Sequence, residues 1–338
     1  MVALSELLVL STVEDMRWIS VEDASAMAAC RSTAASMAAK LAFTGARVDE
    51  LALAVTEAAS NLHKHARAGA LLLRIGIVAG TTCIELVTID DGPGFRDVSA
   101  AMRDGHSTAG TLGVGLGAIR RLASSCDLYS VAGHGTTLVA RFFPAQVPPE
   151  ADCAGLIRPI GGEYESGDAL AAVRVGQTLT GVLCDGLGHG PLAAKAADTA
   201  ISAVLEDPAG EPAALLERVH RRLSSTRGGA VGVVQVTGRT ARFSGLGNVA
   251  AWILADGQRD GLISVPGIAG HKARTIRQFE YPIPAGAAIV LHSDGLSSRW
   301  DLRELPAIEA RDPLVIAGAL LAEAGAHRDD ASVLVLKP

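Results

Sequence analysis

The chain lacks most of the features that mark membrane, secreted or nucleic-acid-binding proteins. It has no uninterrupted apolar stretch of the roughly 18 residues that a membrane-spanning helix needs, and its N-terminus carries no secretory signal. Its net charge of −6, without a run of Lys or Arg, gives no general attraction to nucleic acid or anionic lipid. Only 4% of its residues are aromatic and 20% charged, whereas 49% are hydrophobic, so we expect aliphatic cores. These absences predict a globular, cytoplasmic protein that binds neither nucleic acid nor a membrane.

Cysteine is also scarce, and its spacing excludes two common uses. The five cysteines are Cys30, Cys83, Cys126, Cys153 and Cys184. Their number is odd and no CxxC pair occurs, which favours reduced structural thiols over a disulfide framework or a zinc site.

The length of 338 residues predicts two domains, each large enough to bury its own core. Three prolines and two acidic residues form the clearest linker in the chain. They are Pro144, Pro148, Pro149, Glu150 and Asp152. A short, proline-rich connector is fairly stiff and should hold the two domains near one another. We therefore expect a first domain over residues 1–144, a linker over 145–153 and a second domain over 154–338.

Residues 49–66 are expected to form an amphipathic helix with a polar stripe. Glu57, Asn61 and His65 are spaced four apart and therefore lie on successive turns. On an isolated helix this would usually be a solvated face. Two glycine-rich segments follow, however: Ile-Asp-Asp-Gly-Pro-Gly at 89–94, and Gly-Val-Gly-Leu-Gly at 113–117, which opens another helical pattern. An acid and an amide on a helix, an acid before a glycine turn and a glycine loop at a helix N-terminus together indicate a nucleotide site.

The rest of the first domain predicts an α/β sandwich. A second helix is expected over residues 21–43, a loop through Trp18, and a glycine loop running into a helix over 110–124. Runs of β-branched and apolar residues predict strands at 7–11, 70–78, 82–90 and 136–143.

These motifs resemble the GHKL fold shared by gyrase, heat-shock chaperone, histidine kinase and mismatch-repair ATPases, over about residues 5–143. The resemblance is strongest to the RsbT-like serine kinases of sigma-factor partner switching. It implies binding of ATP and Mg²⁺, with Glu57 as catalytic base and Asn61 as magnesium ligand. The nucleotide-binding residues it implies are Asn61, Asp90, Gly92, Gly94, Gly113, Gly115, Gly117 and Thr136. Asp91 is an alternative to Asp90 as the adenine-binding acid, but its spacing to the glycines is less favourable, and His65 is left out of the set.

In the second domain, acidic residues stand where predicted strands meet turns. Asp168 precedes a strand over 169–175, Asp185 ends a strand in the motif Asp-Gly-Leu-Gly-His-Gly, and Asp294 follows a strand over 288–292. Asp329 and Asp330 precede a strand over 332–336. One such acid is usually a turn former, but four at strand ends indicate a site for hard divalent cations, which prefer oxygen ligands.

This pattern resembles the PPM metal-dependent protein phosphatases, in their SpoIIE-like and RsbX-like branch. The resemblance implies two Mn²⁺ or Mg²⁺ ions and two stacked β-sheets with outer helices at 191–205, 213–224 and 313–324. The metal ligands it implies are Asp168, Asp185, Gly186 through its carbonyl, Asp294 and Asp329. Whether Asp329 or Asp330 binds metal stays open. His189 is either a proton donor to the leaving group or incidental, and Asn248 is assigned to packing.

The fold class predicted is α+β: a GHKL-type α/β sandwich followed by a PPM-type α-β-β-α sandwich. The predicted function is a serine/threonine kinase joined to an opposing phosphoserine/phosphothreonine phosphatase, both acting on STAS-type partner-switching (stressosome) proteins. Three alternatives remain: a nucleotide-sensing phosphatase with a purely regulatory first domain, a non-enzymatic anti-sigma sequestering module, and an inactive phosphatase half. The sequence leaves a homodimer open.

Overall fold

The computed structural model describes residues 6–10, 16–66, 68–102, 115–144, 151–163, 165–273, 275–325 and 328–338. The chain divides into two compact units, one of Glu14–Glu150 and the other of Met1–Val13 with Ala151–Pro338. Each unit is described by itself. Across the described ranges, none of the helices is both long enough and apolar enough to cross a membrane.

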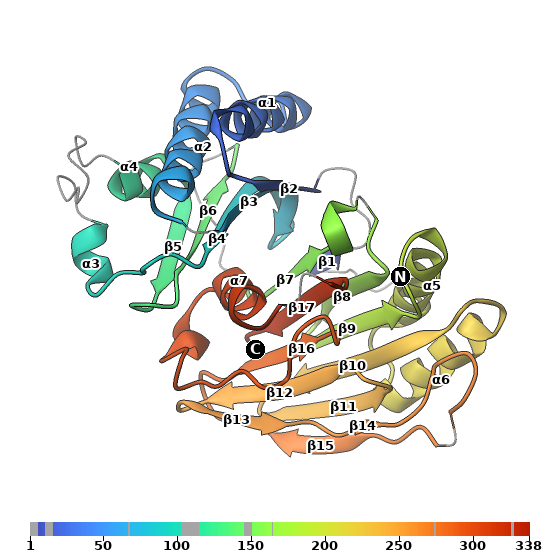
Figure 1. Ribbon diagram of the computed structural model, residues 1–338. Helices are drawn as coiled ribbons and strands as arrows, with labels where there is room; N and C mark the ends of the chain where they lie inside the picture. Colours follow the sequence, from blue (N-terminus) through green and yellow to red (C-terminus); the bar gives the residue numbers. More distant parts are fainter. Residues whose placement is uncertain are drawn as a thin grey trace. The chain divides into compact units, whose positions relative to one another are not determined.

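The unit Glu14–Glu150 is a five-stranded antiparallel sheet with helices packed on one face (Figure 1). The strand order is β2-β3-β4-β6-β5. Its elements are β2 (Met16–Ser20), α1 (Ala24–Lys40), α2 (Ala46–His65), β3 (Gly69–Val78), β4 (Thr81–Asp90), α3 (Val98–Ala101), α4 (Gly115–Leu122), β5 (Ser125–Ser130) and β6 (Thr136–Phe142).

Helix α2 is central to this unit because its two faces have different partners. The apolar face buries Leu51, Val55 and Leu62 in a core with strand residues such as Leu73 and Leu86. Burying these aliphatic side chains stabilises the unit by about 1.5–3 kcal/mol each. With that face fixed on the sheet, the polar stripe is left to face α4.

The other unit contains two β-sheets that pack on each other. The larger sheet has the order β1-β8-β9-β10-β11-β14, with β15 also paired to β11, and the smaller has the order β13-β12-β16-β17-β7. The strands are β1 (Glu6–Leu10), β7 (Cys153–Arg158), β8 (Asp168–Val175), β9 (Thr178–Gly186), β10 (Gly229–Thr237), β11 (Thr240–Leu246), β12 (Ala250–Ala255), β13 (Gln258–Gly261), β14 (Ser264–Val265), β15 (Phe279–Pro282), β16 (Ala288–His292) and β17 (Ala331–Leu336).

Helices cover both outer faces of this β-sandwich (Figure 1). Helices α5 (Pro191–Leu205) and α6 (Pro212–Arg222) pack on the larger sheet, and α7 (Pro313–Ala324) packs on β7 and β17. The predicted α+β fold class is confirmed, and the three expected outer helices form within two residues of their predicted limits.

Three sequence-based assignments need correction. The predicted strand at 7–11 forms as β1, but it pairs antiparallel with β8, so the first domain does not begin at residue 1. A free edge of β8 would expose unpaired N–H and C=O groups, and β1 satisfies them. The expected loop through Trp18 contains β2, and β5 was not predicted. The linker interior at 145–150 lies outside the described residues, and the predicted linker ends one residue late because β7 begins at Cys153.

Candidate active sites

The polar stripe of α2 lies beside the start of α4. A Cβ placed on Gly115 would lie 3.2 Å from both side-chain amide atoms of Asn61 and 3.5 Å from Oε2 of Glu57. The Nδ2 atom of Asn61 is buried and makes no hydrogen bond within the described part of the chain. A buried polar atom without a partner costs free energy unless a ligand or water satisfies it. Two motifs separated in the sequence therefore meet at one place, where they can hold a polar ligand.

Asp90 is the last residue of β4. Its Oδ1 atom accepts a hydrogen bond from the Gly92 amide at 2.8 Å. Burial raises the pKa of Asp90 above its usual value, although the Gly92 hydrogen bond opposes this effect. Asp91 is exposed, and its Oδ1 atom accepts from the Ala68 amide at 2.6 Å. Since Asp91 fastens the connection between α2 and β3, the geometry favours Asp90 as the acid of the site.

Tight backbone packing explains two glycines around Asp90. Gly94 has φ 62°, and a Cβ there would lie 2.1 Å from the Val131 carbonyl oxygen. Gly135 has φ 85°, and a Cβ there would lie 1.9 Å from the carbonyl oxygen of Asp90. Sequence reasoning used Gly135 only to bound a strand. The motif Gly-His-Gly at 133–135 was the available signal for its role.

The remaining predicted residues of this site have different positions. Thr136 pairs directly with Asp90 in the β4–β6 register. Gly92 follows Asp90, and a Cβ there would lie 2.9 Å from the His65 carbonyl oxygen. Gly117 is buried within α4, whereas Gly113 lies outside the described residues. The His65 side chain is exposed.

In the other unit, the four predicted acids come from four strand ends. Asp168 begins β8 and pairs in register with Asp185 at the end of β9. Asp294 follows β16, and Asp329 precedes β17. Asp168 is buried, and its Oδ2 atom has no hydrogen-bond partner among the described residues.

The electrostatics of these acids indicate that they lie near one another. Burial, assisted by the charges of Asp330 and Asp294, raises the pKa of Asp168 to about 7. Burial and then the charges of Asp168, Asp294 and Asp329 raise the pKa of Asp185 to about 9. Mutual repulsion of this kind is relieved when a cation binds.

The structure separates the roles of Asp329 and Asp330. Asp330 is buried, and its two carboxylate oxygens accept hydrogen bonds from the amides of Ile160 at 2.8 Å and Gly167 at 2.6 Å. Asp329 is exposed, and its charge acts on Asp185 and Asp294. Both acids act electrostatically on the cluster, since the charge of Asp330 also raises the pKa of Asp168, but both carboxylate oxygens of Asp330 are already engaged by backbone amides.

The donor set fits a hard divalent cation because it consists of oxygen atoms. Within the described ranges, no three acidic, His or Cys side chains already have the geometry of a metal site. Asp294 instead accepts a hydrogen bond from the side-chain amide of Asn248 and shares another with Asp185. Asn248, which was assigned to packing, thus contacts a predicted ligand. A Cβ on Gly186 would lie 2.3 Å from the Ala193 carbonyl oxygen, so only glycine fits there.

Comparisons with known proteins find relatives of both domains. Residues 20–142 match the family described as "Histidine kinase-like ATPase domain", and residues 176–338 match "Stage II sporulation protein E (SpoIIE)". The serine/threonine-protein kinase RsbT of Bacillus subtilis (strain 168) is 33% identical over 112 residues, which are 33% of this chain and 84% of RsbT. Through its first domain, the chain belongs to the RsbT kinase family.

Two solved structures are also similar to this chain. One, described as "The bacterial stressosome: a modular system that has been adapted to control secondary messenger signaling", is 26% identical with a TM-score of 0.50 and covers 54% of this chain and 97% of its own. The crystal structure of RsbX in complex with magnesium is 18% identical with a TM-score of 0.47, covering 54% of this chain and 92% of its own. The chain thus joins an RsbT-type ATPase domain to a SpoIIE-type phosphatase domain.

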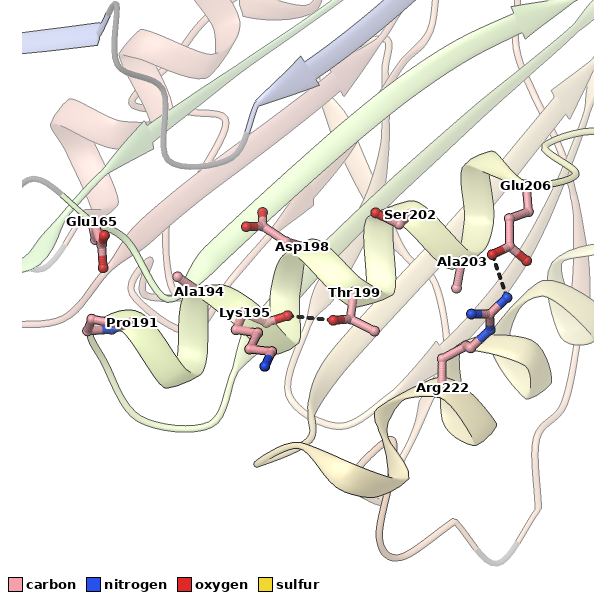
Figure 2. Close-up of a pocket in the computed structure, with 10 residues that line it drawn as sticks. All are labelled: Glu165, Pro191, Ala194, Lys195, Asp198, Thr199, Ser202, Ala203, Glu206 and Arg222. Atoms are coloured by element: carbon pink, nitrogen blue, oxygen red, sulfur yellow. Dashed lines mark hydrogen bonds and ion pairs between the residues drawn. The ribbon is translucent and has the colours of Figure 1, made fainter.

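A pocket of about 410 Å³ in the SpoIIE-type domain lies outside the acidic cluster (Figure 2). It follows α5 and is lined by Glu165, Pro191, Ala194, Lys195, Asp198, Thr199, Ser202, Ala203, Glu206 and Arg222. Figure 2 shows Glu206 paired with Arg222, at 2.6 Å. None of the four clustered acids lines this pocket. Because the candidate metal-binding side chains are the clustered acids, we assign the catalytic site to them and not to the pocket.

Proposed function

We propose that this chain is a bifunctional enzyme that phosphorylates and dephosphorylates serine or threonine residues of a partner protein. The observation that carries the proposal is that one chain contains both sites. The SpoIIE-type domain has the cluster of four acids, and the RsbT-type domain holds Glu57 and Asn61 against α4. A carboxylate near a nucleotide site suits phosphoryl transfer, and clustered carboxylates suit metal-assisted hydrolysis.

In the RsbT-type domain, Glu57 accepts the proton of the substrate hydroxyl while Asn61 holds the magnesium of Mg-ATP. Asp90 binds the adenine amino group, and Thr136 lies beside it in the sheet. The backbone at Gly92, Gly94, Gly115 and Gly117 lets the nucleotide approach closely, as is usual for glycine loops at helix N-termini. Gly113 is assigned to the same loop on its sequence alone.

In the SpoIIE-type domain, Asp168, Asp185, Asp294 and Asp329 would hold two Mn²⁺ or Mg²⁺ ions, with the Gly186 carbonyl as a further donor. Such cations would lower the pKa of a water molecule and neutralise phosphoryl charge. Asp330 acts differently: through the amides of Ile160 and Gly167 it fixes the loop that precedes Asp168.

The partner proposed is a STAS-type protein of a partner-switching pathway, in the cytoplasm. Support comes from the identity with RsbT and from the similarity to a structure described under the bacterial stressosome. Neither nucleic acid nor a membrane is part of this proposal, in keeping with the net charge of −6.

The test uses the intact chain with ATP, Mn²⁺ and a candidate STAS substrate. Glu57→Ala should retain ATP binding and lose phosphoryl transfer, because a base acts on the hydroxyl and does not hold the nucleotide. His65→Ala, an exposed residue of the same helix stripe, is the control. Asp185→Asn should retain transfer and lose dephosphorylation.

The alternatives give other results. If no protein is phosphorylated although ATP binds, the first domain is regulatory. If a sigma factor co-purifies equally well with the Glu57→Ala variant, the domain is a sequestering module. If Asp185→Asn dephosphorylates as fast as the unmodified chain, the assignment of the acids is wrong.

A further inference from the structure

Arg227 has no role so far, yet it lies beside the loop that follows Asp185. Its Nη1 atom lies 3.1 Å from the position that a Cβ on Gly188 would take. The side chain is exposed, and no acidic side chain in the described ranges pairs with its guanidinium. An arginine held near a candidate metal site without a counter-ion is available to an anionic ligand.

The backbone around Arg227 is fixed from several directions. The Gly228 carbonyl accepts a hydrogen bond from the Leu187 amide at 3.0 Å, and Gly229 pairs with Gly186 at the start of β10. The Nε2 atom of His271 lies 3.1 Å from the carbonyl oxygens of both Thr226 and Arg227. Because both of these oxygens are acceptors, the imidazole donates from Nε2. Arg227 is thereby held against the loop of residues 186–188.

That loop connects Arg227 to the acidic cluster. The Gly188 carbonyl oxygen lies 2.9 Å from the position of a Cβ on Gly167, which directly precedes the predicted ligand Asp168. Residue 188 therefore lies next to both the Arg227 guanidinium and the residue that precedes Asp168. Gly188 has φ 86°, a conformation that favours glycine, and a side chain at this position would meet the guanidinium.

Charge balance makes a cation useful at this place. Four carboxylates balance two divalent cations, so an arriving phosphate monoester brings negative charge that the cluster itself does not neutralise. Two neighbouring arginines of the domain already have acidic partners: Arg222 pairs with Glu206, and Arg218 pairs with Asp207. The guanidinium also presents a planar fork of N–H groups that matches two phosphate oxygens.

We propose that Arg227 is the phosphate-binding side chain of the SpoIIE-type domain, donating hydrogen bonds to the non-bridging oxygens of a phosphoserine or phosphothreonine. This assignment rests on the proposed phosphatase function. It adds a substrate-binding residue to the four acids that are proposed to bind metal.

The experiment compares the intact chain with Arg227→Gln, Arg227→Lys and a control, Arg221→Gln, which removes an exposed arginine from α6. Calorimetry measures Mn²⁺ binding first and then binding of inorganic phosphate to the Mn²⁺-loaded protein. Steady-state kinetics with p-nitrophenyl phosphate gives KM and kcat.

Arg227→Gln should bind Mn²⁺ as the unmodified chain does, whereas the Kd for phosphate and the KM should rise about tenfold or more, as expected for losing a charged hydrogen bond. Arg227→Lys should recover part of the affinity, and Arg221→Gln should change neither constant. A merely structural role would lower Mn²⁺ affinity and leave the lysine variant no better than the glutamine variant.

Unchanged phosphate affinity in Arg227→Gln, loss of Mn²⁺ binding in that variant, or no phosphate binding by the unmodified Mn²⁺-loaded chain would each overturn the assignment. The proposed function fails separately. If phosphate binding depends on Arg227 but no phosphoester is hydrolysed, then Arg227 binds an anion in a domain that is not a phosphatase.

Discussion

Replacing Asp185 by Asn should stabilise the metal-free protein while abolishing metal binding. Burial and the charges of Asp168, Asp294 and Asp329 raise the pKa of Asp185 to about 9. A carboxyl group whose pKa is higher in the folded than in the unfolded state destabilises the fold as pH rises. The penalty is absent below about pH 4, where both states are protonated, and grows until the pH reaches the folded-state pKa. Asparagine keeps the shape of the side chain and removes this penalty.

The magnitude follows from the size of the pKa shift. One pKa unit corresponds to about 1.4 kcal/mol, so an isolated group with this pKa would be penalised by about 5 kcal/mol at pH 7.5. Asp185 shares its protons with Asp168 and Asp294, which reduces the effect of any single substitution. We therefore expect a gain of about 1–3 kcal/mol for metal-free Asp185→Asn at pH 7.5, which is a Tm rise of about 3–10 °C for a domain of this size.

Calorimetry in EDTA at pH 5 and pH 7.5 measures this difference. The advantage of Asp185→Asn over the unmodified chain should be small at pH 5 and larger at pH 7.5. Added Mn²⁺ should reverse the order, because a ligand stabilises only the protein that binds it. Asp260→Asn, which removes an exposed acid of β13, should show no pH-dependent difference. Metal-free Asp185→Asn that unfolds at a lower temperature than the unmodified chain at both pH values would refute the repulsion argument.

Two further predictions concern other parts of the chain. Gly135→Ala should weaken ATP binding at least about tenfold, because the new Cβ would displace the end of β4, whereas Gly133→Ala, with φ 90° and open space around it, should cause only mild backbone strain. Equilibrium titration with a fluorescent ATP analogue measures both, and equal affinities for the two variants would contradict the packing argument. Arg259 lies 4.3 Å from the ring centroid of Trp252 and 4.2 Å from that of Trp300, so Arg259→Ala should lower the free energy of unfolding by about 1–2 kcal/mol. Urea denaturation followed by tryptophan fluorescence measures this loss, and an unchanged midpoint and slope would exclude the stacking contribution.

Long helices with a proline at the first position were predictable from the sequence, and short strands were not. Helix α5 has an apolar face, α7 is apolar on nearly all sides, and both begin with proline, so their limits follow from local pattern. Strands β2 and β5 have five and six residues, and they are strands because β3 and β6 pair with them. Strand β1 shows the complementary case: its composition predicts a strand but contains no information about which sheet edge it joins.

Some residues of the candidate sites were also predictable from local sequence, whereas the roles of others depend on distant contacts. Asp185 and Asp90 stand in contiguous motifs, since a strand that breaks into a glycine turn places an acid at the edge of a sheet. Asp329 and Asp330 are adjacent and chemically identical, so the sequence cannot distinguish them. In the structure, the amides of Ile160 and Gly167, which are far away in the chain, donate hydrogen bonds to Asp330.

A last contrast concerns acids that the sequence presents as equivalent. Glu85 is buried on β4, and burial acts to raise its pKa, but Arg74 and Arg141 on the neighbouring strands outweigh this effect and lower it. Its charge is satisfied within the sheet, so Glu85 is structural. Burial and neighbouring acids raise the pKa of Asp168 and Asp185, and no arginine or lysine in the described ranges pairs with either of them. A buried acid without a cationic partner is the kind of group that functional sites retain, because an incoming cation supplies what the fold does not.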